Sequence, residues 1–316
     1  MKISIICPYY NEKFIIEKAV IRMVRQLSLL FYEWELILVN DGSSDNGPRI
    51  VEKLSRENKG IISVGYDLNR GRGFALKKGI ASAAGDIIVT TEIDCSWGDD
   101  IVIRLVDRII SDPAVDFVIA SPNLKGGSYQ NIPLRRVLLS KIGNTIIRLF
   151  FIRDITMNTG MTRAYRSNVI KNLDIDENGK EFHLEVLLKL KALGYKAAEI
   201  PATLKWEDSV LSEASNKRTK RHSSQLWNFI IGHLKFVIFA NPLRYFWLLS
   251  FICFFLGFFI DLYGVIRMMR KEVAIYVLLL GLFMLLFSLM FFGVGVITFQ
   301  NKYIMKELWK KRQGEV

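Results

Sequence analysis

Three polar segments, each following a short apolar run, carry the side chains that could do chemistry in the first hundred residues of this chain. They are PYYNE at 8–12, NDGSSDNG at 40–47 and EIDCSWGDD at 92–100. Each alone could be an ordinary turn, because Asp, Asn, Gly and Ser favour turns for backbone reasons. Three such segments that each directly follow a strand are instead typical of a ligand site.

Asp41 is the carboxylate in these loops whose chemistry is easiest to assign. At a strand end it could accept hydrogen bonds from a nucleotide base or ribose, while Gly42 lets the backbone turn away. The alternative is that Asp41 and Asp45 cap the following helix, which is compatible with ligand binding.

Short apolar runs alternate with amphipathic stretches over residues 1–200 and would position these loops. The predicted strands are Lys2–Ile6, Trp34–Asn40, Ile61–Tyr66, Asp86–Thr91 and Val115–Ala120, and the helical patterns are Ile15–Leu27, Arg49–Glu57 and Gly73–Ala84. This alternation predicts a largely parallel sheet covered by helices, with ligands bound beyond the carboxyl ends of the strands.

Positive charge is concentrated in the C-terminal third of the chain. The 316 residues include 43 Lys and Arg against 31 Asp and Glu, and 51% are apolar, which excludes a disordered chain. Residues 217–316 hold 14 basic and 4 acidic side chains around two long apolar runs. These charges are typical of membrane flanks, so nucleic acid is excluded as a first-choice partner.

Cysteine usage and the N-terminal sequence indicate a reducing compartment. The three cysteines, Cys7, Cys95 and Cys253, form no C-x-x-C pair that would suggest a zinc site or a disulfide framework. The apolar stretch Ile3–Cys7 is too short for the core of a signal peptide. The N-terminal part is therefore expected to be cytoplasmic.

Two apolar segments, at about 245–266 and 273–299, are each long enough to cross a hydrocarbon core of about 30 Å. Buried core helices are the alternative. The short link between them predicts a hairpin, and the basic residues on its outer flanks place both chain ends in the cytoplasm. Helical spacing at 223–240 predicts an amphipathic helix in the membrane interface, with a core helix of the soluble domain as the alternative.

The motifs, in their order and spacing, resemble those of the family 2 glycosyltransferases with a GT-A fold. Within that family the resemblance is to the polyprenyl-phosphate group, which includes dolichyl-phosphate mannose synthases and bactoprenol glucosyltransferases. It covers nearly the whole chain. The motifs are PYYNE at 8–12, VNDGSSD at 39–45, NRGRGFA at 69–75, EID at 92–94, R-R-x-x-x-S at 135–140 and the C-terminal hairpin.

This resemblance implies a nucleotide diphosphate sugar as donor. Glu92 and Asp94 stand where the family has its D-x-D motif, and with Ser96 they would hold a divalent cation, Mg²⁺ or Mn²⁺, that offsets the diphosphate charge. A surface acidic turn is the alternative reading of this motif. The implied donor contacts are Pro8, Tyr10, Glu12, Asp41, Arg72, Glu92 and Asp94. Arg72 would lie beside the phosphates at a helix start, and a plain helix entrance is the alternative.

On the acceptor side, Arg135, Arg136 and Ser140 resemble an element associated with a lipid phosphate. The planar arginine side chain suits phosphate because it donates two parallel hydrogen bonds. Met161 occupies a position that is acidic in the bacterial members that the sequence resembles. Asp154 is the nearest remaining carboxylate and, in addition to Asp94, is the candidate for a catalytic role. A phosphate acceptor is already an anion and needs little help from a base, so this loss favours a phosphate over a hydroxyl acceptor.

The sequence thus predicts an α/β protein built on a GT-A domain, which is Rossmann-like and of the nucleotide-diphospho-sugar transferase type. This cytoplasmic domain covers residues 1–216. A basic juxtamembrane segment with an interfacial helix follows at 217–242, a two-helix transmembrane hairpin at 243–301, and a basic cytoplasmic tail at 302–316.

The predicted reaction is the inverting transfer of a hexose from a UDP-glucose or GDP-mannose type of donor to dolichyl or undecaprenyl phosphate, at the cytoplasmic face of the cell membrane. Two alternatives stay open. One is a glycosyltransferase that acts on a hydroxyl of a lipid-linked saccharide or a cell-surface polysaccharide. The other is a degenerate nucleotide-binding membrane protein without transferase activity. Homo-oligomerisation also stays open.

Overall fold

The structure, a computed structural model, describes residues 1–150, 154–206 and 242–312. The chain divides into two compact units, Met1–Ile230 and Ile231–Val316, and each is described by itself. The predicted interfacial helix at 223–240 lies outside the described residues. The predicted domain boundaries therefore stay predictions.

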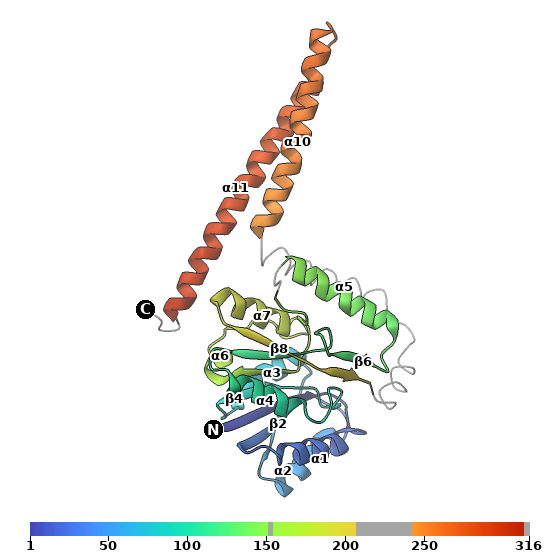
Figure 1. Ribbon diagram of the computed structural model, residues 1–316, viewed down its shortest axis with the longest axis vertical. Helices are drawn as coiled ribbons and strands as arrows, with labels where there is room; N and C mark the ends of the chain where they lie inside the picture. Colours follow the sequence, from blue (N-terminus) through green and yellow to red (C-terminus); the bar gives the residue numbers. More distant parts are fainter. Residues whose placement is uncertain (151–153, 207–241, 313–316) are drawn as a thin grey trace. The chain divides into compact units, whose positions relative to one another are not determined.

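A seven-stranded sheet lies at the centre of the first unit (Figure 1). Its strands are β1 (Lys2–Tyr9), β2 (Glu33–Asp41), β3 (Ile61–Tyr66), β4 (Ile87–Thr90), β5 (Phe117–Ser121), β7 (Arg163–Arg166) and β8 (Ala197–Pro201). They lie in the order β3-β2-β1-β4-β7-β5-β8. Strand β7 runs antiparallel to β4 and β5, whereas the other pairs are parallel. All five predicted strands are confirmed, and β7 and β8 are two further strands of the sheet.

Helices cover both faces of this sheet (Figure 1). The helices described in this unit are α1 (Ile16–Leu27), α2 (Gly47–Glu57), α3 (Arg72–Ser82), α4 (Ile101–Ser111), α5 (Leu134–Phe150), α6 (Ser167–Lys171) and α7 (Phe182–Leu193), of which α5 does not lie against the sheet. Side chains alternate between the faces of a strand, so two neighbours on β1 identify what lies on each side. Cys7 Sγ lies 3.7 Å from Met23 Sδ of α1, whereas a Cβ on Gly79 of α3 would lie 2.4 Å from Ile6 Cγ2. Helices α1 and α3 therefore pack on opposite faces.

The central strands are buried on both faces. Every residue of β4 and β5 is buried, and so are most residues of β1 and β2. Two-sided burial explains why these strands read as continuous apolar runs, which is typical of parallel sheets. A second, two-stranded parallel sheet pairs β6 (Ser128–Gln130) with β9 (Thr203–Lys205).

In the part of the second unit that the structure describes, residues 242–312, two long apolar helices pack against each other. They are α10 (Pro242–Met269) and α11 (Ile275–Arg312). Their segments Tyr245–Met269 and Ile275–Asn301 have mean hydropathies of 2.2 and 2.7 and are long and apolar enough to cross a membrane. They overlap the two predicted spans, and most of their large apolar side chains are exposed.

Glu35 of β2 is a buried carboxylate that joins three segments of the first unit. Its Oε1 accepts hydrogen bonds from Ser4 Oγ and Ala84 N, both at 2.6 Å, and its Oε2 lies 2.5 Å from Lys2 Nζ. Burial raises the pKa of Glu35, but the hydrogen bonds from Lys2, Ser4 and Ala84 together outweigh burial and leave the pKa below its usual value. The carboxylate is therefore ionised in the fold and stabilises it.

Glu35→Gln is expected to lower the free energy of unfolding at neutral pH by about 1–3 kcal/mol, because the amide loses the ion pair with Lys2 and points an N–H group at a donor. Since the folded-state pKa lies below the unfolded one, this stabilisation is present above about pH 4 and is lost as the pH falls through the folded-state value. Thermal unfolding of the detergent-solubilised chain at about pH 7 and about pH 3 measures the effect, with the exposed Glu17→Gln as control. An equal drop in Tm at both pH values would contradict this assignment.

Candidate active site

The carboxyl ends of β1, β2 and β4 meet at one edge of the sheet and bring the three polar loops together. The register of β1 against β2 pairs Tyr9 with Asn40, the residues directly before Tyr10 and Asp41. Two hydrogen bonds join the first two loops: Asn11 N donates to Ser43 Oγ at 3.0 Å, and Ser44 N donates to Asn11 Oδ1 at 2.9 Å. Asn11 has a φ of +57°, a left-handed conformation that Asn tolerates. The predicted gathering of these loops is therefore present.

The predicted nucleotide contacts of the first loop differ in their exposure. Pro8 is half-buried in β1, and Tyr10 is 46% exposed. The backbone carbonyl of Glu12 accepts the N–H groups of Ile15 and Ile16, both at 3.0 Å, and so begins α1. Tyr10 is thus the member of this loop with a ring accessible to a base.

Asp41 holds the next loop of the site in place. Its Oδ1 accepts hydrogen bonds from Tyr66 OH at 2.7 Å, Arg70 N at 2.9 Å and Gly71 N at 3.1 Å, while its Oδ2 accepts one from Asn69 Nδ2 at 3.1 Å. Burial, and then this carboxylate, raise the pKa of the Tyr66 hydroxyl. Asp41 is buried, with 5% of the residue exposed, and its Oδ1 already accepts three hydrogen bonds. A nucleotide would therefore approach the carboxylate on the Oδ2 side, which accepts only one from a side chain within the described residues.

The capping alternative applies to Asp45 and not to Asp41. Asp45 Oδ1 accepts from Gly47 N, the first residue of α2, at 2.9 Å, and its Oδ2 accepts from Lys13 N at 3.0 Å. Gly42 has a φ of +68°, and a Cβ there would lie 2.4 Å from Asn69 N. The chain therefore needs glycine at 42 to turn and to let the loop at 69 approach.

The acidic motif follows β4 in a tight turn. Asp94 Oδ1 accepts from Ser96 N at 3.0 Å, and Glu92 Oε2 accepts from Trp97 Nε1 at 2.9 Å and from Ser96 Oγ at 3.3 Å. Glu92 Oε1 also lies 3.5 Å from Arg72 Nη1. Burial and the neighbouring Asp94 raise the pKa of Glu92, against the opposing effect of Arg72. Trp97 was not among the predicted site residues, although its aromatic ring lies inside the motif.

These residues suit a hard divalent cation. Two carboxylates and a hydroxyl are oxygen donors of the kind that Mg²⁺ and Mn²⁺ prefer. No group of three or more His, Cys, Asp and Glu side chains able to hold a metal occurs within the described residues. A cation here would thus take its remaining ligands from a bound diphosphate and from water. Glu92 is already engaged by Trp97 and Arg72, so Asp94 is the better placed ligand.

The start of α3 is packed against a distant loop. Gly71 has a φ of +95°, and Cβ atoms on Gly71 and Gly73 would lie 2.6 Å from Asn178 O and 2.7 Å from Asn178 C. Phe74 N donates to Asn178 O at 3.1 Å. The carboxylate of Glu185 holds this loop by accepting from Glu177 N at 2.8 Å. These contacts favour the plain helix entrance over an open phosphate site, although Arg72 reaches the acidic motif.

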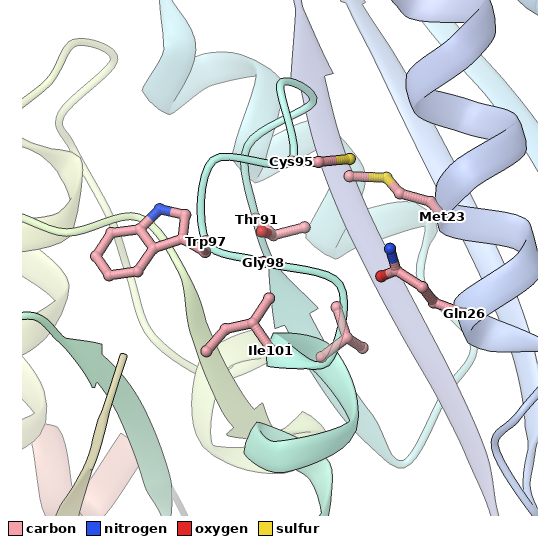
Figure 2. A pocket seen from close by; sticks show the side chains of 8 residues that line it. Met23, Gln26, Thr91, Cys95, Trp97, Gly98 and Ile101 are labelled. Atoms are coloured by element: carbon pink, nitrogen blue, oxygen red, sulfur yellow. The ribbon is translucent and has the colours of Figure 1, made fainter. Parts of the chain in front are cut away.

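A small pocket lies behind the acidic motif, between α1 and α4 (Figure 2). Gln26, whose side chain points into the pocket, has a buried Nε2 without a hydrogen-bond partner among the described residues. Its lining is mainly apolar and consists of Met23, Gln26, Thr91, Cys95, Trp97, Gly98, Ile101 and Val102. The pocket supports the back of the motif and lacks the polar lining that a nucleotide needs.

The predicted acceptor residues share the N-terminal half of α5. Arg135 and Arg136 are exposed, and the Arg136 guanidinium lies 4.8 Å from the centre of the Trp206 ring. Ser140 is hydrogen-bonded to Tyr129 of β6. Tyr129 and Trp206 were not predicted from the sequence, because they reach α5 only through tertiary packing.

Asp154, the predicted catalytic carboxylate, lies on the surface. Its side chain is 60% exposed, and its Oδ2 lies 2.6 Å from Lys191 Nζ of α7. Another carboxylate, Glu199 of β8, fixes the neighbouring segment by accepting from Thr156 N at 2.9 Å and Met157 N at 3.0 Å. Met161 is buried. The structure does not bring Asp154 into contact with the acidic motif.

Gly73→Ala is expected to destabilise the protein by about 1–3 kcal/mol, because the added methyl group meets backbone atoms that cannot move aside cheaply. Gly143→Ala in α5 is the matched control, since a Cβ there meets nothing within 4 Å. It should stabilise the helix by about 0.5–1 kcal/mol. The shifts in Tm measure both effects, and a Gly73→Ala variant as stable as the wild type would contradict the close packing of α3 on residue 178.

Comparison with known proteins agrees with this architecture. The chain is 29% identical over 205 residues to the dolichol-phosphate mannosyltransferase of Pyrococcus furiosus, which covers 64% of this chain and 56% of that protein. It is 30% identical over 177 residues to the undecaprenyl-phosphate 4-deoxy-4-formamido-L-arabinose transferase of Salmonella choleraesuis, covering 54% and 51% of the two chains. The chain spans about half the length of these relatives.

Among solved structures, glucosyl-3-phosphoglycerate synthase from Mycobacterium tuberculosis superposes with a TM-score of 0.52 at 18% identity, covering 71% of this chain and 74% of that one. A structure of that synthase with Mn²⁺, UDP and phosphoglyceric acid has a TM-score of 0.50, covering 68% and 75%. These likenesses concern the fold and confirm the predicted GT-A type. The family model for glycosyl transferase family 2 matches residues 4–174, more than half of the chain, and the protein therefore belongs to that family.

Proposed function

We propose that the protein transfers a hexose from a nucleotide diphosphate sugar to a polyprenyl phosphate at a membrane surface. The observation that carries this proposal is the exposed face of α5, which combines apolar and basic side chains. Leu134, Leu138, Leu139 and Ile142 are between 47% and 85% exposed. Arg135, Arg136 and Lys141 are exposed on the same helix. A lipid phosphate has this combination of chemistry, with an anionic head on an apolar chain.

The relatives support the same acceptor class. Two of them are named for dolichol phosphate and undecaprenyl phosphate. The two apolar helices α10 and α11 would keep the enzyme in the membrane that holds such a lipid.

In the proposed mechanism, Asp94 and Glu92 would hold Mg²⁺ or Mn²⁺, which supplies positive charge that stabilises the departing nucleoside diphosphate. Asp41 and Tyr10 would orient the nucleotide at the edge of the sheet. Arg136 would donate parallel hydrogen bonds to the lipid phosphate and direct one of its oxygens toward the sugar. That oxygen forms the new bond to the anomeric carbon, and the bond to the diphosphate breaks with its electron pair, which inverts the configuration.

A general base is not required in this mechanism, because the acceptor is already an anion. This fits the position of Asp154, which is paired with Lys191 on the surface. A hydroxyl acceptor would need a base near the sugar, so the exposed Asp154 favours the phosphate.

We further propose that the catalytic unit and the C-terminus face the cytoplasm. The basic side chains that flank the two apolar segments support this orientation. A cysteine introduced at Ser55 should then react with an impermeant reagent only after permeabilisation, whereas one at Met269 should react in intact cells. The opposite pattern would overturn the orientation.

The acid stability of the labelled lipid product distinguishes a phosphate acceptor from a hydroxyl acceptor. Membranes that contain the protein should move label from UDP-glucose or GDP-mannose into the lipid phase when polyprenyl phosphate is added, and mild acid should release the sugar. Changing both Arg135 and Arg136 to Ala should raise the apparent KM for the lipid roughly tenfold or more and change that for the donor less than about twofold. Lys18→Ala with Arg25→Ala on α1 removes the same charge elsewhere and serves as the control. An acid-stable product would favour a hydroxyl acceptor, and nucleotide binding without any product would favour a degenerate enzyme.

Metal dependence is tested at Asp94. Chelation with EDTA should abolish transfer, and added Mg²⁺ or Mn²⁺ should restore it. Asp94→Asn should lower kcat by roughly 100-fold or more while Tm stays near the wild-type value, since the amide is a poorer ligand of nearly the same shape. Asp107→Asn on the exposed side of α4 is the control. Full activity in EDTA would rule out the proposed role of the cation.

A further inference from the structure

The end of β9 lies between the acidic motif and α5. Lys205 N donates to Ser96 O, inside the acidic motif, at 2.8 Å. The next residue, Trp206, donates its backbone N–H to Gln130 O of β6 at 3.1 Å. Two backbone hydrogen bonds at adjacent residues thus fix the end of β9, one to the acidic motif and one to β6.

The Trp206 ring then meets the arginine proposed to bind the acceptor. The Arg136 guanidinium lies 4.8 Å from the ring centre, within the range of a cation–π interaction. A cation–π contact is made by the charge of the guanidinium and does not require its N–H groups, which are the groups that bind phosphate. The contact with Trp206 therefore restricts Arg136 and still leaves its donors for a ligand.

A second aromatic residue holds the next turn of α5. Tyr129 of β6 donates from its hydroxyl to Asn123 Oδ1 at 3.0 Å and is hydrogen-bonded to Ser140. Lys141 Nζ lies 6.0 Å from the centre of the same ring. Tyr129 of β6 and Trp206, the residue directly after β9, thus each contact one of two successive turns of α5.

We propose that Trp206 is a positioning residue for the acceptor, which fixes the Arg136 guanidinium relative to the acidic motif before the lipid phosphate binds. This inference rests on the proposed function and adds a residue to it. A free arginine side chain has many rotamers and loses that freedom when it binds a ligand. Stacking on Trp206 restricts the side chain in advance, and the bond from Lys205 to Ser96 sets its place relative to the donor. The consequence is tighter acceptor binding without any contact between Trp206 and the phosphate.

The test compares variants of the full chain in membranes, with apparent KM values for polyprenyl phosphate and for the nucleotide sugar. Trp206→Leu should raise the acceptor KM about 3- to 30-fold and leave the donor KM within about twofold. Trp206→Phe should recover most of the loss, because a phenyl ring also stacks with a guanidinium. Phe31→Leu, which changes an exposed aromatic residue outside the site, should leave both KM values unchanged.

A double-mutant cycle shows whether Trp206 acts through Arg136. On an Arg136→Ala background, Trp206→Leu should have no further effect on the acceptor KM. If Trp206→Leu lowers Tm, Arg136→Lys replaces it in the test, since lysine keeps the charge but has no planar face. Arg136→Lys should then raise the acceptor KM in the same range.

The outcomes distinguish a failure of the positioning role of Trp206 from a failure of the proposed transfer reaction. An acceptor KM within about twofold of the wild type in both Trp206→Leu and Arg136→Lys, or a full further loss in the double variant, would overturn the positioning role alone. A wild-type protein that transfers no sugar to polyprenyl phosphate would overturn the proposed function, and the positioning role with it.

Discussion

Backbone hydrogen bonds between β1 and its two parallel neighbours determine where the three polar loops of the candidate site lie. The register pairs Tyr9 with Asn40 on one side and Ile6 with Thr90 on the other, so the three loops leave the sheet at the same edge. Asp41 then fixes a fourth segment, because its carboxylate accepts two backbone N–H groups and two side-chain donors. A shift of one residue in that register would move Asp41 to the other face of the sheet and release the loop that it holds.

Arginine plays three different physical roles in this domain. Arg163 is fully buried and donates hydrogen bonds to the carbonyl oxygens of Gly160, His183 and Asn158. Arg72 pairs with a carboxylate of the acidic motif. The Arg136 guanidinium lies over the aromatic ring of Trp206. Among these three, Arg136 is the one whose hydrogen-bond donors suit an incoming phosphate, and this difference comes from its surroundings.

Sequence patterns predicted the parts of the fold that depend on local signals. The apolar runs of β1 to β5 and the turn residues around Asp41 and Asp94 are continuous in the sequence, so period and composition suffice to find them. Strand β7 is short, and its place between β4 and β5 depends on pairing with strands far away in the chain. The contact of Gly73 with Asn178 and that of Arg136 with Trp206 likewise have no local signature. These two contacts therefore could not be predicted from sequence patterns, although they hold the start of α3 and the side chain of Arg136 in place.

The C-terminal helices show how a membrane hairpin can form where burial from water provides no drive for helix pairing. Association in lipid depends on close packing and on hydrogen bonds between helices. In this hairpin a Cβ on Gly257 would lie 2.9 Å from Gly281 O, so small residues let the backbones approach. Ser250 Oγ donates across the pair to Ser288 O at 2.9 Å.

Anchoring of the enzyme in the membrane, as proposed, changes what the proposed acceptor site has to achieve. If the acceptor is a membrane lipid, as proposed, enzyme and acceptor share one surface, and confinement raises the effective concentration of the lipid phosphate. The site then needs little affinity for the long apolar chain and can rely on recognition of the head group. A shallow, exposed helix such as α5, with Arg136 held in place on Trp206, is sufficient for that task, whereas a soluble enzyme would need a deep apolar pocket for the same acceptor.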